Sequence, residues 1–461
     1  MSIEPQDPIR VLHRLHNRLR KDIPNLQKLE KFYKGDFPPP WTPDKDVDAE
    51  FRALLERAKL NYMRPIVDSR VERMKIKGFR LSADTEAADP QMWKIWEANR
   101  LGAESKKAFK EALVKGRCYL SVWYPGPDHE FPQIAIEDAT QVYVEHEPGT
   151  HRRVAAIKVW DDDTTGVEVT YANVYLPNVI YKYVWQDIED VTGTRGEWVE
   201  RAEVVEHELG IPLVPLLNNP DLTNEGESEI ADVLASQERI NEMVFNRSLA
   251  GWFAAHRQKH AAGIDIPRDP ETGEPLREYL EELNRRLMVG KIAVAESENA
   301  KFGTFDATDP NKYTEIIEAE KQSIGEQKKL PRHYFLKEGS SVNGQSIKAA
   351  EAGLVAVVKD KMDVFGEAIE EALVLSRKVL GEETSVDAEV VWASPEHRTE
   401  GELTDSVVKQ HQEGLISRQT ALEILGFSPQ EIARELVRFE QERTDPFEAL
   451  NRQLAKDMGD V

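Results

Sequence analysis

The chain has 461 residues, enough for two or three domains with substantial hydrophobic cores. Its 83 acidic residues outnumber its 60 basic residues and give a net charge of −23 at pH 7, which disfavours a conventional DNA-binding domain with a basic face. The single cysteine, Cys118, excludes an intramolecular disulfide framework and suits a reducing cytosol.

The first predicted element is a helix over residues 7–34, in which arginines and leucines alternate in an amphipathic pattern. It lacks the apolar stretch of a signal peptide. Such a helix can lie on a membrane surface, but ordinary packing against the rest of the protein is favoured. The run from Phe37 to Trp41 contains three prolines and predicts an extended linker. No apolar run in the sequence approaches membrane-spanning length.

Residues 51–112 again show a helical pattern, which a turn or edge strand interrupts at residues 75–79. Beyond Gly116 the pattern changes to short runs of alternating apolar residues that continue to Trp185. This period of two predicts an antiparallel β meander. Helices that flank such a meander make the predicted fold class α+β.

A helical hairpin follows, with predicted helices at residues 226–259 and 307–331. Gln237 and Asn241 interrupt the apolar stripe of the first helix, which favours contact with neighbouring helices over burial in a monomer core. The second helix begins at Asp309-Pro310, a cap followed by a proline at the first helical position. An exposed hairpin on an ordinary globular protein is the alternative. The apolar positions of the hairpin are Ile230, Val233, Leu234, Ile240, Val244, Ile316, Ile317 and Ile324.

A charged segment and a glycine- and serine-rich segment follow the first hairpin helix. The hairpin tip, residues 260–306, includes a short helix that carries Arg277, Glu278, Glu281, Glu282, Arg285 and Arg286. Residues 337–344 are rich in glycine and serine and predict a loop. We predict a long helix from Ser346 to Leu380, a strand from Val386 to Trp392, and small charged helices after Glu400.

Recognised catalytic motifs are missing from this sequence. It contains no P-loop, no Gly-x-Ser-x-Gly nucleophile elbow and no dinucleotide fingerprint. His256, His260 and Asp265 are close enough in sequence to share a divalent metal, but the basic residues between the two histidines disfavour a cation there. Cys118 lies in an apolar strand without an identifiable base, so we interpret it as a core residue. No catalytic, metal or cofactor site is predicted.

The order of several short motifs resembles that of the portal proteins of long-tailed bacteriophages. The first half of the chain carries Phe32-Tyr33-x-Gly35, Asn61-Tyr62, Ile66-Val67-Asp68, Val71-Glu72-Arg73, Gly78-Phe79, Ile95-Trp96-x-x-Asn99-x-Leu101, Ala112-Leu113-x-x-Gly116-x-Cys118-Tyr119 and Val214-Pro215-Leu216. The second half carries Gly226-Glu227-Ser228-Glu229-Ile230, Leu330-Pro331-x-His333-Tyr334, Ser346-Ile347-x-Ala349-Ala350-Glu351 and Trp392. No single motif is specific, and their order across most of the chain carries the resemblance.

This resemblance implies a ring, typically of twelve subunits, at one capsid vertex, through which genomic DNA is packaged and later ejected. It implies the following domains: a wing at 1–225, stem helices at 226–259 and 307–331, a clip at 260–306, a tunnel loop at 332–345, a long helix and wing strand at 346–395, and a helical crown at 396–461. The implied partners are copies of itself, double-stranded DNA, the terminase large subunit, a head-tail adaptor, and the major capsid and scaffolding proteins. No membrane and no cofactor are implied, and the protein would be found in the virion after assembly in the host bacterial cytoplasm.

The resemblance also implies roles for three groups of residues. The hairpin's apolar residues would form the subunit interface, and the charged residues of the tip would dock the packaging motor and the adaptor. The DNA channel would be lined near the tunnel loop by Arg332, Lys337, Gly339, Ser340, Ser341, Asn343, Gly344 and Lys348. An acidic wall with few basic positions suits a sliding duplex, because every neutralised phosphate adds affinity. Two alternatives remain: a ring- or shell-forming scaffold that does not conduct DNA, and a hydrolase within residues 1–225.

Overall fold

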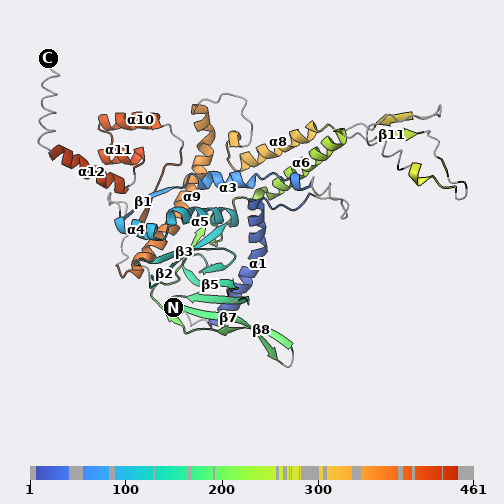
Figure 1. The fold of residues 1–461 in the computed structure, drawn as a ribbon. Coiled ribbons are helices and arrows are strands. Elements are labelled where there is room, and N and C mark those ends of the chain that lie inside the picture. The colour runs from blue at the N-terminus through green and yellow to red at the C-terminus, as the bar shows by residue number, and fades with distance from the viewer. Residues whose placement is uncertain are drawn as a thin grey trace, which may run out of the picture. The chain divides into compact units, whose positions relative to one another are not determined.

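The computed structural model describes residues 7–40, 55–81, 89–127, 130–164, 166, 168–190, 193–255, 259–262, 267–268, 270, 273–279, 281, 301–304, 309–334, 344–382, 388–396, 400–427 and 429–444. The chain divides into two compact units. The larger comprises Met1–Lys34, Met63–Asp232 and Lys328–Val461, and the smaller comprises Gly35–Tyr62 and Val233–Gln327. Helices and sheets both contribute, so the mixed fold predicted from the sequence is confirmed (Figure 1).

The meander predicted from Gly116 to Trp185 is divided between two sheets: the runs from Val142 onward form the largest sheet of the larger unit, whereas the runs at Cys118–Val122 and Ile134–Ile136 belong to a second sheet, so the prediction of one meander is wrong for these first runs. The strands of the largest sheet are antiparallel and lie in the order β4 (Val142–His146), β5 (Arg153–Asp162), β6 (Val169–Leu176), β7 (Val179–Asp190) and β8 (Gly193–Glu200), with β9 (Val205–Glu206) paired to β7. Helix α1 (Pro8–Lys34) covers one face of this sheet, where Leu12 and Leu15 pack against Ile157 and Val174 (Figure 1). Ordinary packing of this first helix is thereby confirmed.

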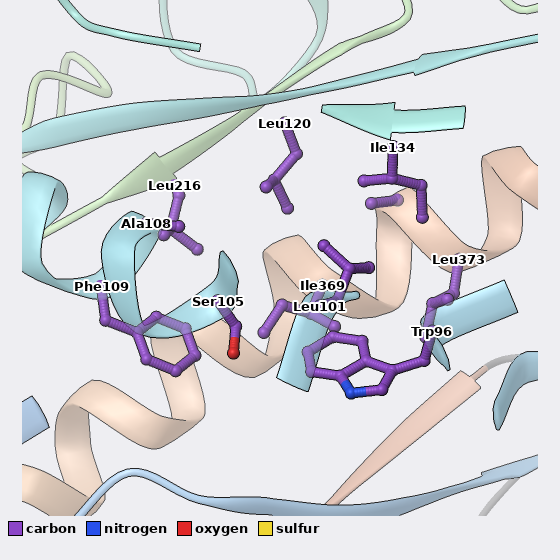
Figure 2. Close-up of a pocket in the computed structure, with 11 residues that line it drawn as sticks. Trp96, Leu101, Ser105, Ala108, Phe109, Leu120, Ile134, Leu216, Ile369 and Leu373 are labelled. Atoms are coloured by element: carbon purple, nitrogen blue, oxygen red, sulfur yellow. The ribbon is translucent and has the colours of Figure 1, made fainter. Parts of the chain in front are cut away.

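A second sheet of the larger unit has the order β10 (Leu213–Leu217), β2 (Arg117–Trp123) and β3 (Gln133–Glu137). Helices α4 (Pro90–Ala98), α5 (Leu101–Lys115) and α9 (Gly344–Val379) contribute to the core beside it. Figure 2 shows Trp96, Leu120, Ile134 and Ile369 around a small cavity of about 20 Å³ in this core. The lining is apolar, which predicts a dry cavity.

Cys118 lies in β2 and is fully buried. Burial raises the pKa of its thiol far above the ordinary value, so the side chain stays protonated. The interpretation of Cys118 as a core residue is therefore confirmed.

Strand β1 (Ile76–Leu81) pairs antiparallel with β13 (Ala388–Trp392), which joins two segments that are distant in sequence. Helix α3 (Met63–Val71) precedes β1. After β13 come α10 (Glu400–Gln412), α11 (Arg418–Leu425) and α12 (Pro429–Thr444), the small helices predicted from the sequence. Arg80 of β1 pairs with Glu423 of α11 at 2.7 Å, which fixes α11 beside this small sheet.

The smaller unit contains α6 (Leu234–Ala255) and α8 (Asn311–Gln327), preceded by the short helix η1 (Ala231–Val233) that spans the boundary of the units. Strands β11 (Lys259–Ala262) and β12 (Lys301–Thr304) form an antiparallel pair. The short helix η2 (Arg332–Tyr334) of the larger unit follows α8 in the chain. None of the helices in the described ranges is both long and apolar enough to cross a membrane.

Candidate functional site

The two hairpin helices lie side by side (Figure 1). Most of the apolar residues predicted for a subunit interface are buried within the single chain, namely Ile230, Val233, Leu234, Ile240, Val244, Ile317 and Ile324. Ile316 differs, because 46% of its surface is exposed. Contact of this set with another subunit stays a prediction, and Ile316 is the member with free apolar surface to offer.

Gln237 and Asn241 hold an extended segment of the same chain. The Gln237 side-chain amide donates to the carbonyl oxygen of Leu60 at 2.7 Å and accepts from the Tyr62 amide at 2.9 Å. The Asn241 side-chain oxygen accepts from the Leu60 amide at 3.0 Å. The two side chains therefore supply the pairing that a strand would give to this segment. The sequence predicted that Gln237 and Asn241 contact neighbouring helices. Their hydrogen-bond partners Leu60 and Tyr62 lie outside a helix, so the prediction is wrong for these contacts.

A paired Arg–Glu contact also joins the hairpin helices. The guanidinium of Arg239 on α6 contacts both carboxylate oxygens of Glu320 on α8, at 2.9 and 3.0 Å. This contact lowers the pKa of the Glu320 carboxyl below its ordinary value. Because Arg239 is largely exposed, the Arg239–Glu320 ion pair adds little stability. Its main effect is to set the register of the two helices.

A buried ionic cluster in the larger unit lies where the chain approaches the hairpin. Glu229 pairs with the Arg70 guanidinium at 3.0 Å and with the Lys361 ammonium at 2.7 Å. Lys361 also donates to the side-chain oxygen of Asn218 at 2.6 Å. Arg70 donates to the carbonyl oxygen of Lys328, just beyond α8, at 2.7 Å. Arg70 thus binds both the segment that leads into the hairpin and the segment that leaves it.

The charges of this cluster depend on one another. Burial alone would raise the pKa of Glu229, but Arg70 and Lys361 outweigh burial and hold that pKa below its ordinary value. Burial lowers the pKa of Lys361, and Glu229 only partly opposes that shift. A carboxylate between two cations is the arrangement in which all three groups stay ionised in a buried site.

The backbone is also tightly packed beside this cluster. A side chain at Gly226 would place its Cβ 2.0 Å from the carbonyl oxygen of Gly116, a distance that real Cβ atoms do not show. Gly116 itself has a φ of +86°, in the region that favours glycine. Both glycines belong to the motifs on which the family resemblance depends, and their close approach gives those motifs a physical reason.

Arg73 forms a second group of polar contacts, with residues near the start of the predicted tunnel loop and after its end. Its guanidinium donates to the Tyr334 hydroxyl at 3.2 Å, near the start of the loop, and to the Glu351 carboxylate at 3.0 Å, after it. It also donates to the carbonyl oxygen of Pro395 at 2.8 Å. His333 lies 3.5 Å from the same Glu351 oxygen. The two ends of the loop are therefore fixed to one side chain.

The predicted channel and docking residues fall partly outside the described ranges. Arg332 lies exposed in η2, Gly344 begins α9, and Lys348 lies in α9 with an undescribed side chain. Arg277, Glu278 and Glu281 are exposed. The residues outside the description are Lys337, Gly339, Ser340, Ser341, Asn343, Glu282, Arg285 and Arg286. Their roles stay predictions.

No metal centre emerges from the part of the chain that is described. His260 lies in β11, opposite Gly303 of β12, while His256 and Asp265 fall outside the described residues. Among the described residues, no group of three or more histidine, cysteine, aspartate and glutamate side chains could hold a metal ion.

Sequence reasoning missed the roles of the buried ionic residues. Arg70 and Arg73 are three residues apart, so they lie on the same side of α3 and its continuation. Ile66 and Val67 on this helix are fully buried, which places both arginines in an apolar setting. Arginine in a buried helix usually needs a carboxylate, and this was the signal that could have pointed to Glu229 and Glu351.

Comparison with known proteins gives one matching family. The model of the family described as phage portal protein, SPP1 Gp6-like, matches residues 12–444. The portal protein of Mycobacterium phage D29 is 30% identical over 415 residues, which cover 86% of this chain and 81% of that protein. The portal protein of Mycobacterium phage L5 is 29% identical over 415 residues, with the same coverage.

Two solved structures are similar to this chain at lower sequence identity. A chain in the neck of a native GTA particle, computed with C12 symmetry, has a TM-score of 0.44 and 11% identity, covering 85% of this chain and 95% of that chain. A chain in the neck of an empty GTA particle, computed with C6 symmetry, has a TM-score of 0.45, 11% identity and the same coverage.

The contacts of Arg73 predict how substitutions at Arg73 and Glu351 change the free energy of unfolding. Arg73→Met leaves the Glu351 carboxylate buried without its partner, so the free energy of unfolding should fall by about 3–5 kcal/mol. The double variant Arg73→Met with Glu351→Leu removes the isolated charge and should recover most of that loss. Urea denaturation of the single and double variants measures both effects. A single variant as stable as the wild type would show that these contacts do not hold the loop ends.

The Glu229 cluster predicts a dependence of stability on pH. Because the folded-state pKa of Glu229 lies below its ordinary value of 4.5, its ionic contribution is present above that pH and is lost as the pH falls through the folded-state pKa. Glu229→Gln should therefore lower stability at neutral pH and flatten the loss of stability on acidification. Thermal unfolding of both proteins between neutral and acidic pH measures the two slopes. Equal slopes would contradict the assigned ionic role.

Proposed function

This chain belongs to the SPP1 Gp6-like family of phage portal proteins, and we propose that it forms a closed ring through which double-stranded DNA enters and leaves a capsid. The observation that carries the proposal is the extent of the family match, which begins in α1 and ends in α12. The match therefore includes the meander, the hairpin, the buried ionic contacts and the C-terminal helices. We further propose that the protein has no catalytic role.

The proposed domains follow the chain in portal order. Residues 1–225 form the wing, 226–259 and 307–331 the stem, 260–306 the clip, 332–345 the tunnel loop, 346–395 the long helix and wing strand, and 396–461 the crown. The paired helices α6 and α8 support the stem assignment, because they make a hairpin that is stabilised within one chain. Copies of such an elongated element can be arranged side by side in a ring.

The buried Glu229 cluster and the contacts of Arg73 suggest how the protein holds the tunnel loop beside moving DNA. Arg70 fixes the segments at both ends of the hairpin, and Arg73 fixes the segments at both ends of the tunnel loop. With its ends held, the loop can contact a passing duplex without moving the hairpin. The net charge of −23 favours weak contacts with DNA, which allow the duplex to slide. Arg332 is an exposed cation beside this loop.

The clip is proposed to dock the packaging motor, which contains the terminase large subunit, and later the head-tail adaptor. Its exposed residues Arg277, Glu278 and Glu281 carry both signs of charge, which suits reversible docking and partner selection. The wing would face the major capsid and scaffolding proteins. In this proposal the protein assembles in the host cytoplasm and remains in the virion at one capsid vertex.

Electron microscopy of the purified full-length protein tests the ring. We expect closed rings with an axial hole wide enough for a DNA duplex, and a matching large species in sedimentation. Rings without such a hole would favour a scaffold that does not conduct DNA. A protein that sediments as a monomer at all concentrations tested would contradict the ring itself.

Deletion of Gly339 to Asn343 tests the loop. We expect rings that still form and dock into capsids but package or retain less DNA, because the loop no longer reaches the duplex. The measurement is the length of the packaged genome in particles that carry the deletion.

A control variant replaces Val342 with glycine and Asn343 with serine, so that all five positions are glycine or serine and the length of the loop is kept. If only the deletion fails, then length matters more than side-chain chemistry. Full-length, stably held DNA in the deletion particles would leave the loop without a role in DNA passage.

A further inference from the structure

The chain crosses between the two main sheets of the larger unit at residues 207–212, here called the crossing segment. Strand β9 before it belongs to the largest sheet, and β10 after it belongs to the sheet that contains β2. Leu209 and Ile211 of the crossing segment are buried, each with 3% of its surface exposed. Ile211 belongs to a core cluster that includes residues of α1, β2, β4 and β7. The crossing segment therefore contributes to the core that both sheets share.

His207 begins the crossing segment, and only 8% of its surface is exposed. Its Nδ1 atom accepts a hydrogen bond from the backbone amide of Leu209 at 3.1 Å. An imidazole nitrogen that accepts a hydrogen bond carries no proton, so the ring is neutral and its proton lies on Nε2. Nε2 is buried and has no hydrogen-bond partner among the described residues. The contact with Leu209 thus requires the uncharged form of His207.

Backbone contacts hold the crossing segment against the turn between β6 and β7. The His207 amide donates to the carbonyl oxygen of Asn178 at 2.9 Å, and the Asn178 amide donates to the carbonyl oxygen of Gly210 at 3.0 Å. The Gly210 amide donates in turn to the side-chain oxygen of Asn178 at 2.7 Å. Asn178 has a φ of +66°, which asparagine tolerates better than most residues. Between these contacts, the His207 ring holds the Leu209 amide.

The surroundings of the His207 ring oppose a positive charge. From β2, the uncharged Trp123 ring packs edge to face against it, with the ring centroids 5.3 Å apart. Burial, and then the charge of Lys378 on α9, lowers the pKa of His207 below its ordinary value of 6.5. The flanking Glu206 and Glu208 are exposed and do not offset these effects. Protonation of His207 is therefore unfavourable while the crossing segment stays in place.

We propose that His207 is an acid-sensitive latch, which holds the crossing segment in place when it is neutral and releases it when it is protonated. A proton on Nδ1 turns the acceptor into a donor, so the imidazolium and the Leu209 amide would present hydrogen atoms to each other. The cation would also be buried near the charge of Lys378. Release of the crossing segment removes both conflicts and takes Leu209 and Ile211 out of their packing.

The direction of the pH effect follows from linkage. Because the pKa of His207 lies lower in the folded protein than in an unfolded chain, acid favours the form in which the ring is released. The contact is complete above pH 6.5 and is lost as the pH falls from there through the folded-state pKa. All of these residues belong to the larger unit of one chain, so the inference does not depend on the proposed ring.

Amide hydrogen–deuterium exchange of the full-length protein tests the latch. Peptides that cover residues 207–212 are followed by mass spectrometry at neutral and at acidic pH, and the rates are corrected for the intrinsic effect of pH on exchange. We expect about tenfold faster corrected exchange of this segment at acidic pH, because local opening exposes its amides. Equal corrected rates at both pH values in the wild type would overturn the proposal.

His207→Asn is the matched variant. The side-chain oxygen of asparagine can take the place of Nδ1 as the acceptor for the Leu209 amide, but it does not titrate. We expect the crossing segment of this variant to be protected at both pH values. His13→Asn, at an exposed histidine of α1, should keep the acid response of the wild type. An acid response that persists in His207→Asn would contradict the assignment to His207.

Lys378 provides a measurement that a merely structural histidine would not affect. Lys378 is exposed on α9, so Lys378→Gln should fold as the wild type does. Removal of its charge relieves one of the two causes that lower the pKa of His207. The pH at which exchange of the crossing segment is half-maximal should therefore move upward by a few tenths of a unit. An unchanged or lower midpoint would overturn the proposal, even if His207→Asn were unprotected at both pH values.

Discussion

The buried carboxylate of Glu229 is the interaction on which the rest of the larger unit depends. It lies between Arg70 of α3 and Lys361 of α9, so one anion connects three segments that are far apart in sequence. Burial of ionic groups is costly, and such a cluster is not in itself evidence of high stability. Its effect is selective, because another register of these segments would leave a buried charge unpaired. The pairing of these three segments within the larger unit is therefore specified.

The same short helix also organises the tunnel loop. Arg73 follows Arg70 by three residues and reaches Tyr334 near the start of the loop and Glu351 after it. Within the larger unit, α3 and its continuation thus bind residues on both sides of the hairpin segment and of the predicted tunnel loop. The groups that these contacts bring together are buried and charged. Separating them would expose an unpaired charge to an apolar setting, which opposes their separation.

Periodicity predicted that several elements exist, because it depends only on residues that are close in sequence. The meander and α1 follow from alternation and from an amphipathic stripe, and the existence of the hairpin follows from its helical pattern. Long-range pairing was not predictable in this way. The pairing of β1 with β13 and the contacts of Gln237 and Asn241 with residues 60–62 join segments separated by more than a hundred residues. An amide in an apolar stripe indicates that a partner exists, but not which backbone supplies it.

The same limit applies to the predicted subunit interface. A stripe of isoleucine and valine shows that a helix face is buried, but it cannot distinguish burial within one chain from burial between chains. In the structure most of that stripe is buried within the single chain, and Ile316 is the member that stays exposed. Contacts between subunits of an acidic protein must also overcome repulsion, since each copy carries a net charge of −23. Apolar side chains on ordered loops and groove edges are suited to this, because their contribution does not depend on opposite charges. Leu222, Ile424 and Phe427 are exposed apolar side chains of the larger unit.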